Sequence, residues 1–181
     1  MWRVDKTKIP PDKLEHPELR QFCDEIQRTD PTLIKAICVH EAGHGVYMRR
    51  AGAKKLRFKG MTIFWDSDKN AFDVAAAAIA PIFDDAWVVT ADNLDAVALF
   101  HAAGGVVTLA LTEETNSMDR EDIKQFRAVC LELPDKSIDV VKSWKRAQEN
   151  ISKDLRNPQL RKEIWKLEKE FEDWLLGGDL V

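Results

Sequence analysis

Apolar side chains recur along this chain mostly at the three- and four-residue spacing that places them on one face of a helix. A contrasting segment, residues 56–65, is rich in β-branched and aromatic residues and predicts one or two strands. The helical spacing predicts helices over residues 17–28, 31–51, 71–89, about 93–111, 119–133, 135–153 and 158–176. The pattern therefore predicts a mainly α fold with a small β element, an α+β class.

The helix predicted over residues 31–51 has suitable residues at both ends. Asp30 is a suitable N-cap, and Pro31 suits the first helical position. Arg49 and Arg50 lie in the last turn, where positive charge interacts favourably with the helix dipole, and glycine follows at position 52. These signals make this helix the best defined element of the chain.

Two histidines lie on that helix, in the motif His40-Glu41-Ala42-Gly43-His44. Residues at i and i+4 lie one above the other on one helical face, so both imidazoles can bind one Zn²⁺ ion. Glu41 can then take a proton from a water that the metal activates. The face is otherwise apolar and supplies few polar partners for buried core histidines. The motif predicts a zinc-dependent peptidase with His40 and His44 as metal ligands and Glu41 as general base.

A catalytic zinc ion usually has three protein ligands and one water, so one more ligand is needed. The residues after His44 do not continue the motif to a third histidine, which excludes the metzincin class. A lone histidine in an apolar helix, such as His101, is more often a core residue than a ligand. The candidates for a ligand or a neighbouring acceptor are His101, Asp84, Asp85 and Asp122.

Two further roles follow from position. Tyr47 shares the histidine face, where core packing is more typical than donation to a developing oxyanion. The strand predicted at residues 61–65 is either an ordinary sheet strand or an edge on which an extended substrate adds by backbone hydrogen bonds. The last two predicted helices contain three tryptophans, Trp144, Trp165 and Trp174. We expect these side chains to pack a C-terminal helical hairpin on the body of the protein or on a partner.

Length and charge limit the number of domains and the kinds of partner that we expect. A chain of 181 residues is one domain, or one domain with an appendage. We expect an N-terminal arm and short helix over 1–29, a zinc peptidase-like domain over 30–133, and a C-terminal helical hairpin over 134–181 packed on the same domain. The net charge of −4, without a basic stripe, argues against nucleic acid or an anionic membrane as a partner.

Cysteine use and hydropathy predict the compartment. The three cysteines are an odd number without a C-x-x-C pair, which indicates free thiols in a reducing compartment. The longest apolar runs, residues 74–83 and 96–111, are short or interrupted, so we expect no membrane span. Residues 1–13 are polar and unlike a signal peptide. We expect a cytoplasmic protein.

The order of motifs resembles the peptidase domain of FtsH-type AAA metalloproteases. The resemblance covers roughly residues 30–130: the HEAGH motif, an Ala-rich helix (Ala75 to Asp85), and an aspartate that opens a helix in Asp122-Ile123-Lys124-Gln125. By this resemblance Asp122 is the third zinc ligand. The family's Ala-Glu-Glu-like element is replaced by Ile82-Phe83-Asp84-Asp85, and the sequence contains no Walker A motif and no membrane anchor.

The leading hypothesis is thus a zinc metallopeptidase that works without the family's ATPase on peptides or already unfolded polypeptides, alone, as a homo-oligomer, or with a separate partner protein. An alternative is a non-catalytic zinc-binding regulatory or adaptor module derived from such a peptidase. A closed site with a fourth protein ligand, His101 or Asp119, would favour that alternative. A third hypothesis is a regulatory peptidase that cleaves a repressor, which would need a DNA-binding partner.

Overall fold

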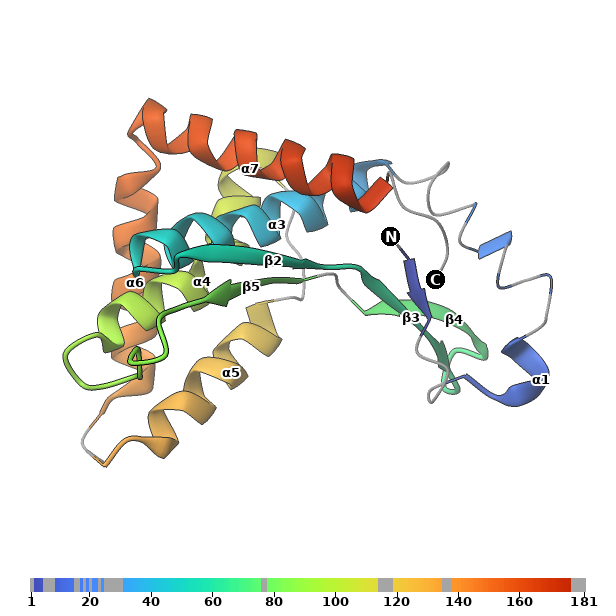
Figure 1. The fold of residues 1–181 in the computed structure, drawn as a ribbon, viewed down its shortest axis with the longest axis horizontal. Coiled ribbons are helices and arrows are strands. Elements are labelled where there is room, and N and C mark those ends of the chain that lie inside the picture. Colours follow the sequence, from blue (N-terminus) through green and yellow to red (C-terminus); the bar gives the residue numbers. More distant parts are fainter. Residues whose placement is uncertain are drawn as a thin grey trace.

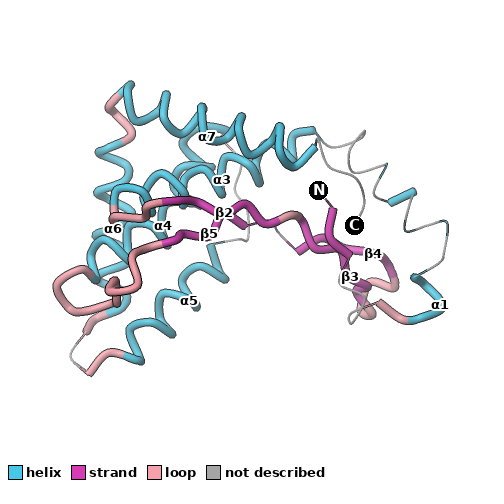
Figure 2. Tube along the Cα trace, viewed as in Figure 1, coloured by secondary structure: helices cyan, strands magenta, loops and turns pink. Residues whose placement is uncertain are grey.

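The computed structural model describes residues 2–4, 9–14, 17, 19, 21, 22, 24, 31–75, 78–113, 119–134 and 138–176. The fold is mainly helical with two small sheets, as the sequence predicted (Figures 1 and 2). The elements in chain order are β1 (Trp2–Val4), α1 (Pro11–Leu14), α3 (Pro31–Arg50), β2 (Lys55–Lys59), β3 (Met61–Asp66), β4 (Ala71–Ala75), β5 (Ala78–Ile82), α4 (Leu94–Thr112), α5 (Asp119–Glu132), α6 (Val140–Asp154) and α7 (Pro158–Leu176).

The helix α3 lies at the centre of a helical body, defined here as α3–α7 with β2 and β5. It packs against α4 on one side, α7 on another, and β5 on a third, while α6 packs against α4 (Figure 1). The residues from Ala36 to Met48 are buried without interruption. A helix covered on several sides can carry its motif residues in the interior, away from bulk water.

The remaining strands form a sheet lobe, defined here as β1, β3 and β4 with α1. The order in this sheet is β1-β3-β4, with β1 parallel and β4 antiparallel to β3. In the helical body, β2 pairs with β5 in antiparallel register, with Phe58 opposite Ile79. Figure 1 shows β2 running on toward β3, so that one ribbon joins the helical body to the sheet lobe. Of the one or two strands predicted within residues 56–65, two are found, β2 and β3, with Gly60 between them.

The helix predicted over residues 71–89 is wrong, because this segment forms β4 and β5 and then a loop. Alanine favours helices, but Pro81 inside a helix would cost about 3 kcal/mol and is tolerated at a strand edge. The side chain of Ile79 is buried at 3% exposure between half-exposed alanines, which is the alternation of a strand. Pairing with β2 therefore outweighs local propensity. The resemblance also included an Ala-rich helix from Ala75 to Asp85, and this part of it is wrong, because residues 78–82 form β5.

Most other boundaries agree with the prediction. The helix α3 ends at Arg50, α5 runs over Asp119–Glu132, and α7 runs over Pro158–Leu176. The helix α6 begins at Val140, five residues later than predicted, because the Asp139 carboxylate accepts from the Lys142 N–H as its N-cap. The predicted cap Asp30, the cysteine at position 23 and most of the helix predicted over 17–28 lie outside the described residues.

The helix α4 corrects the expectation about apolar length. Its 19 residues have a mean hydropathy of 1.7, so by length and composition it is able to cross a membrane. Half of that stretch is buried in the protein, against α3, α5 and α6. A core helix meets the same criterion, and the contacts on α4 are those of a core helix.

Candidate metal centre

The motif residues of α3 lie in the interior of the helical body. His40, Glu41 and His44 have exposed fractions of 2%, 6% and 6%. The two imidazoles stand edge to face, with ring centroids 4.6 Å apart. The i, i+4 spacing on the helix therefore brings the two rings together as the sequence predicted.

Asp122 completes a group of three possible metal ligands with His40 and His44. Its side chain comes from the first turns of α5, far from the motif in sequence. The Nε2 atoms of His40 and His44 are 3.0 Å apart, and Asp122 Oδ2 lies 3.2 Å and 3.3 Å from them. Of the three third-ligand candidates other than Asp122, none belongs to this group in the described part of the chain.

The donor set fits a zinc ion. Tetrahedral zinc with bonds of about 2.0–2.1 Å holds its ligand atoms about 3.3 Å apart, close to the three separations found here. Asp122 Oδ2 is buried and has no hydrogen-bond partner of good geometry among the described residues. A bound cation would satisfy this oxygen, which without a cation depends on a protonated imidazole to offset the cost of its burial. Two imidazoles and one carboxylate supply three of the four ligands that tetrahedral zinc takes.

The second ring nitrogen of each histidine differs in its surroundings. His44 donates from Nδ1 to the main-chain carbonyl oxygen of Phe100 on α4, at 2.5 Å. This bond fixes the tautomer of a neutral His44, so that Nε2 presents its lone pair to a metal. His40 Nδ1 is buried without a partner in the described part of the chain. The structure thus supplies an orienting group for one ligand, a carbonyl rather than the expected Asp84 or Asp85.

A glycine allows α4 to approach the ligands. A Cβ atom on Gly104 would lie 2.5 Å from Nε2 of His40 and 2.5 Å from Nε2 of His44. Any side chain here would therefore enter the space of the ligand atoms. The same contact requires Gly43 on α3, where a Cβ would lie 2.9 Å from the Ala103 carbonyl oxygen. Glycines at the crossing of α3 and α4 thus shape one wall of the centre.

Glu41 lies beside the ligands and outside their group. Its Oε2 accepts a hydrogen bond of 2.8 Å from the main-chain N–H of Ile79 in β5. Burial raises the pKa of Glu41, although the nearby His44 and His40 act in the opposite direction. A buried carboxylate with a raised pKa is suited to accepting and returning a proton.

His44 and Asp122 form an ion pair in the metal-free protein. Burial works to lower the pKa of His44, but its contact with Asp122 raises that pKa to about 9. Burial works to raise the pKa of Asp122, but its contacts with His40 and His44 hold it well below its usual range. In the metal-free protein a proton on His44 thus occupies the place that a cation would take.

The remaining candidates lie outside the ligand group. Asp84 is exposed and forms a surface ion pair with Lys54, and Asp85 is also exposed. The Tyr47 hydroxyl donates to Asp154 of α6 at 3.0 Å, which supports the packing interpretation. His101 packs near Phe126 of α5, and burial lowers its pKa to about 4. The side chain of Asp119 lies outside the described part.

Sequence reasoning missed three main-chain features of the site: the Phe100 carbonyl, the Ile79 amide and the close approach at Gly104. Main-chain groups have no residue signature, so the first two could not be read from the chain. The pair Gly104-Gly105 within an apolar helix was a usable signal, because glycine in a helix is costly unless a close approach needs it.

No protein-family model matches this chain, and no curated protein matches it. Membership of the FtsH-type family is therefore not shown by comparison with known proteins. The structure shows an HEXXH-like arrangement, in which His40, His44 and Asp122 form a group that could hold a metal ion.

Proposed function

We propose that this protein is a zinc-dependent peptidase related to the FtsH-type peptidase domain, acting on unfolded polypeptides or peptides. One observation carries the proposal: His40, His44 and Asp122 converge with no fourth protein ligand among the described residues, and a buried carboxylate, Glu41, stands beside them without joining them. A purely structural zinc site uses four protein ligands and has no need of an adjacent base.

His40, His44 and Asp122 would hold the ion. Bound Zn²⁺ would supply Lewis acidity, lowering the pKa of a water and polarising the scissile carbonyl. Glu41 would take the proton of the attacking water and deliver it to the nitrogen of the leaving amine. The Phe100 carbonyl would keep His44 in the tautomer that binds the ion. The burial of the motif would keep bulk water away from these groups.

An extended substrate would bind along β5. The sequence left open whether residues 61–65 form such an edge or an ordinary sheet strand, and β3 lies between β1 and β4 without a free edge in its sheet. Within the described residues β5 pairs only with β2, and its Ile79 N–H reaches Glu41. A strand added at the free edge of β5 would thus pass the catalytic carboxylate.

The alternative of a zinc-binding regulatory or adaptor module is supported less well. His101, the candidate fourth ligand with a described side chain, stands outside the ligand group. A repressor-cleaving role would use the same site and differs only in substrate. Cytoplasmic location and a homo-oligomeric state or separate partner protein remain proposals that follow from the sequence.

The test is cleavage of an unfolded polypeptide, such as labelled casein, by zinc-loaded wild type and Glu41→Gln. We expect cleavage by wild type, inhibition by a chelator, and a loss of about 1,000-fold or more in the variant with zinc retained. An Asp84→Asn variant serves as the matched carboxylate control and should cleave normally. Equal activity in wild type and Glu41→Gln, or no cleavage by zinc-loaded wild type, would refute the peptidase.

A further inference from the structure

The free edge of β5 has a single main-chain donor. Neighbouring residues of a strand direct their N–H and C=O groups to opposite sides, so residues two apart share a side. Ile79 directs its N–H to Glu41, away from β2, while the Ile82 carbonyl accepts from the Lys54 N–H on the β2 side. Pro81 shares the outward side with Ile79 and has no N–H. Along the described part of β5, Ile79 is therefore the one outward donor.

This donor is already occupied by the proposed general base. The bond from the Ile79 N–H to Glu41 Oε2 is 2.8 Å long, and both residues are buried. An extended polypeptide pairing with β5 needs the same N–H for one of its carbonyl oxygens. Because Pro81 offers only its carbonyl, the substrate cannot move its pairing along the strand to another donor. The substrate and Glu41 therefore compete for the same donor, the Ile79 N–H.

We infer that the substrate backbone displaces Glu41 from the Ile79 N–H, so that pairing on β5 releases the carboxylate toward the reacting water. This inference rests on the proposed peptidase function and adds a substrate class to it. Extended polypeptides that pair with the edge free the carboxylate, whereas small amides and esters that cannot pair leave it on Ile79. Ile79 is thus a positioning residue that acts through Glu41.

A binding cycle tests the competition without turnover. Zinc-loaded Glu41→Ala and Glu41→Gln both lack the base, but the glutamine retains an oxygen that accepts from Ile79. Fluorescently labelled casein should bind Glu41→Ala about three- to tenfold more tightly than Glu41→Gln, the value of one net hydrogen bond. The same comparison in an Ile79→Pro background, which lacks the N–H, should give no difference. The two Glu41 variants are compared within one background each time, so the packing loss caused by Ile79→Pro is common to both members of its pair.

Equal binding by the two Glu41 variants, or a difference that persists with Ile79→Pro, would overturn the inference and leave the peptidase intact. Casein that binds none of the variants would count against the proposed function itself. A second measurement is independent of binding and of the stability of Ile79→Pro. The Ile79 amide proton should exchange with solvent at least about tenfold faster in Glu41→Ala than in wild type. Unchanged exchange would also overturn the inference.

Discussion

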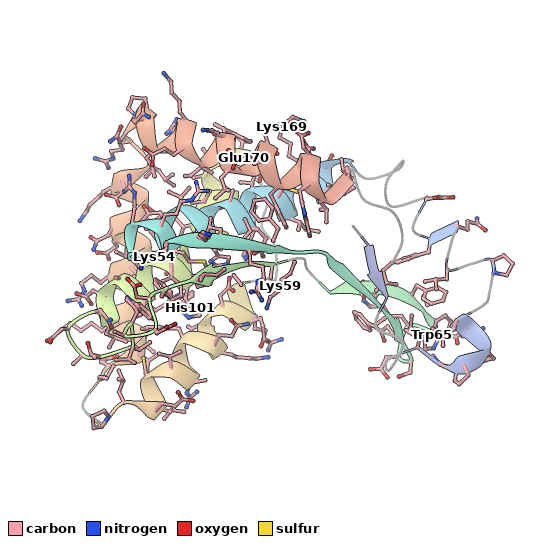
Figure 3. All side chains as sticks on the ribbon, viewed as in Figure 1. Lys54, Lys59, Trp65, His101, Lys169 and Glu170 are labelled. Atoms are coloured by element: carbon pink, nitrogen blue, oxygen red, sulfur yellow. The ribbon has the colours of Figure 1, made fainter. Side chains whose placement is uncertain are left out.

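The helical body and the sheet lobe bury different kinds of side chain. In Figure 3, Trp65 lies in the sheet lobe, and His101 and Lys169 lie in the helical body. Every buried polar or charged side chain among the described residues is in the helical body: His40, Glu41, His44, Thr108 and Glu168. In the sheet lobe, the described side chains that are buried are apolar, such as Ile63 and Phe72. Buried polar groups are costly, so their confinement to one region indicates where the chemistry lies.

The difference has a topological cause. The helix α3 is enclosed by α4, α7 and β5. The helix α4 supplies the Phe100 carbonyl, β5 supplies the Ile79 amide that binds Glu41, and α7 supplies packing surface. The strands β3 and β4 contact chiefly each other and β1, and the turn between them is exposed. Substitutions in the helical body should therefore alter metal binding, and equally disruptive substitutions in the sheet lobe should not.

Among substitutions outside the ligands and Glu41, the largest effect is expected from Gly104→Ala, because the new methyl group would enter the space of the His40 and His44 nitrogens. Zinc affinity should fall by about 100-fold. The control is Gly52→Ala, since Gly52 has a φ of +102° and no atom of the described residues lies within 4 Å of an added Cβ. It should lose about 1 kcal/mol of stability and keep its zinc. Competition with a chelator measures both, and normal affinity in Gly104→Ala would contradict the geometry.

The next effect is a pH dependence confined to the helical body. His44 has a pKa of about 9 without metal, so at pH 7 it must release a proton when zinc binds. Apparent zinc affinity should rise by up to about tenfold per pH unit from pH 7 toward pH 9. Calorimetry in buffers of different ionisation enthalpy should show about one proton released at pH 7. Release of no proton would mean that His44 is already neutral.

The same shift predicts how stability changes with pH. A pKa raised on folding contributes stability that is fully present below the unfolded value of about 6.5. For the metal-free protein this contribution should be lost as pH rises through 9. His44→Gln should abolish this decline, as measured by chemical unfolding between pH 6 and pH 10. A decline of equal size in the variant would place its origin outside the metal centre.

Two buried phenylalanines, one in each region, allow a comparison between substitutions with a similar loss of stability. Phe126, fully buried, lies one helical turn after Asp122 and packs against Trp144; Phe72 is 8% exposed and packs against Trp65. Replacement of either by alanine should cost about 3 kcal/mol or more. Zinc affinity should fall by about tenfold in Phe126→Ala, because α5 carries Asp122, and it should not change in Phe72→Ala. Equal zinc affinities in the two variants would remove the distinction between the regions.

The smallest effect is expected at the exposed turn of the sheet lobe. Lys69 pairs there with Asp66 and Asp73, and 65% of its side chain is exposed. Exposed ion pairs contribute little, so Lys69→Ala should leave both the unfolding midpoint and the zinc content unchanged. A clear loss of stability, measured by thermal unfolding, would show that the turn has a larger structural role than its exposure indicates.

The sequence predicted the centre better than its surroundings. The positions of His40 and His44 follow from helical spacing alone, and α3 has clear end signals. Asp122 came from a resemblance, since the contact between α3 and α5 has no local signature. The error at residues 71–89 is instructive, because alanine propensity is weak compared with strand pairing, and Pro81 already argued against a helix. The Ile79 amide depended on that strand and so could not be foreseen.

The most direct test is the zinc content of purified wild type, Asp122→Ala and Asp84→Ala by elemental analysis. Wild type and Asp84→Ala should each hold about one zinc per chain, because Asp84 is an exposed surface residue. Asp122→Ala should lose zinc, since two histidines remain from a three-ligand site. Wild type without zinc, or Asp122→Ala with a full complement, would contradict the account of a His40, His44 and Asp122 centre.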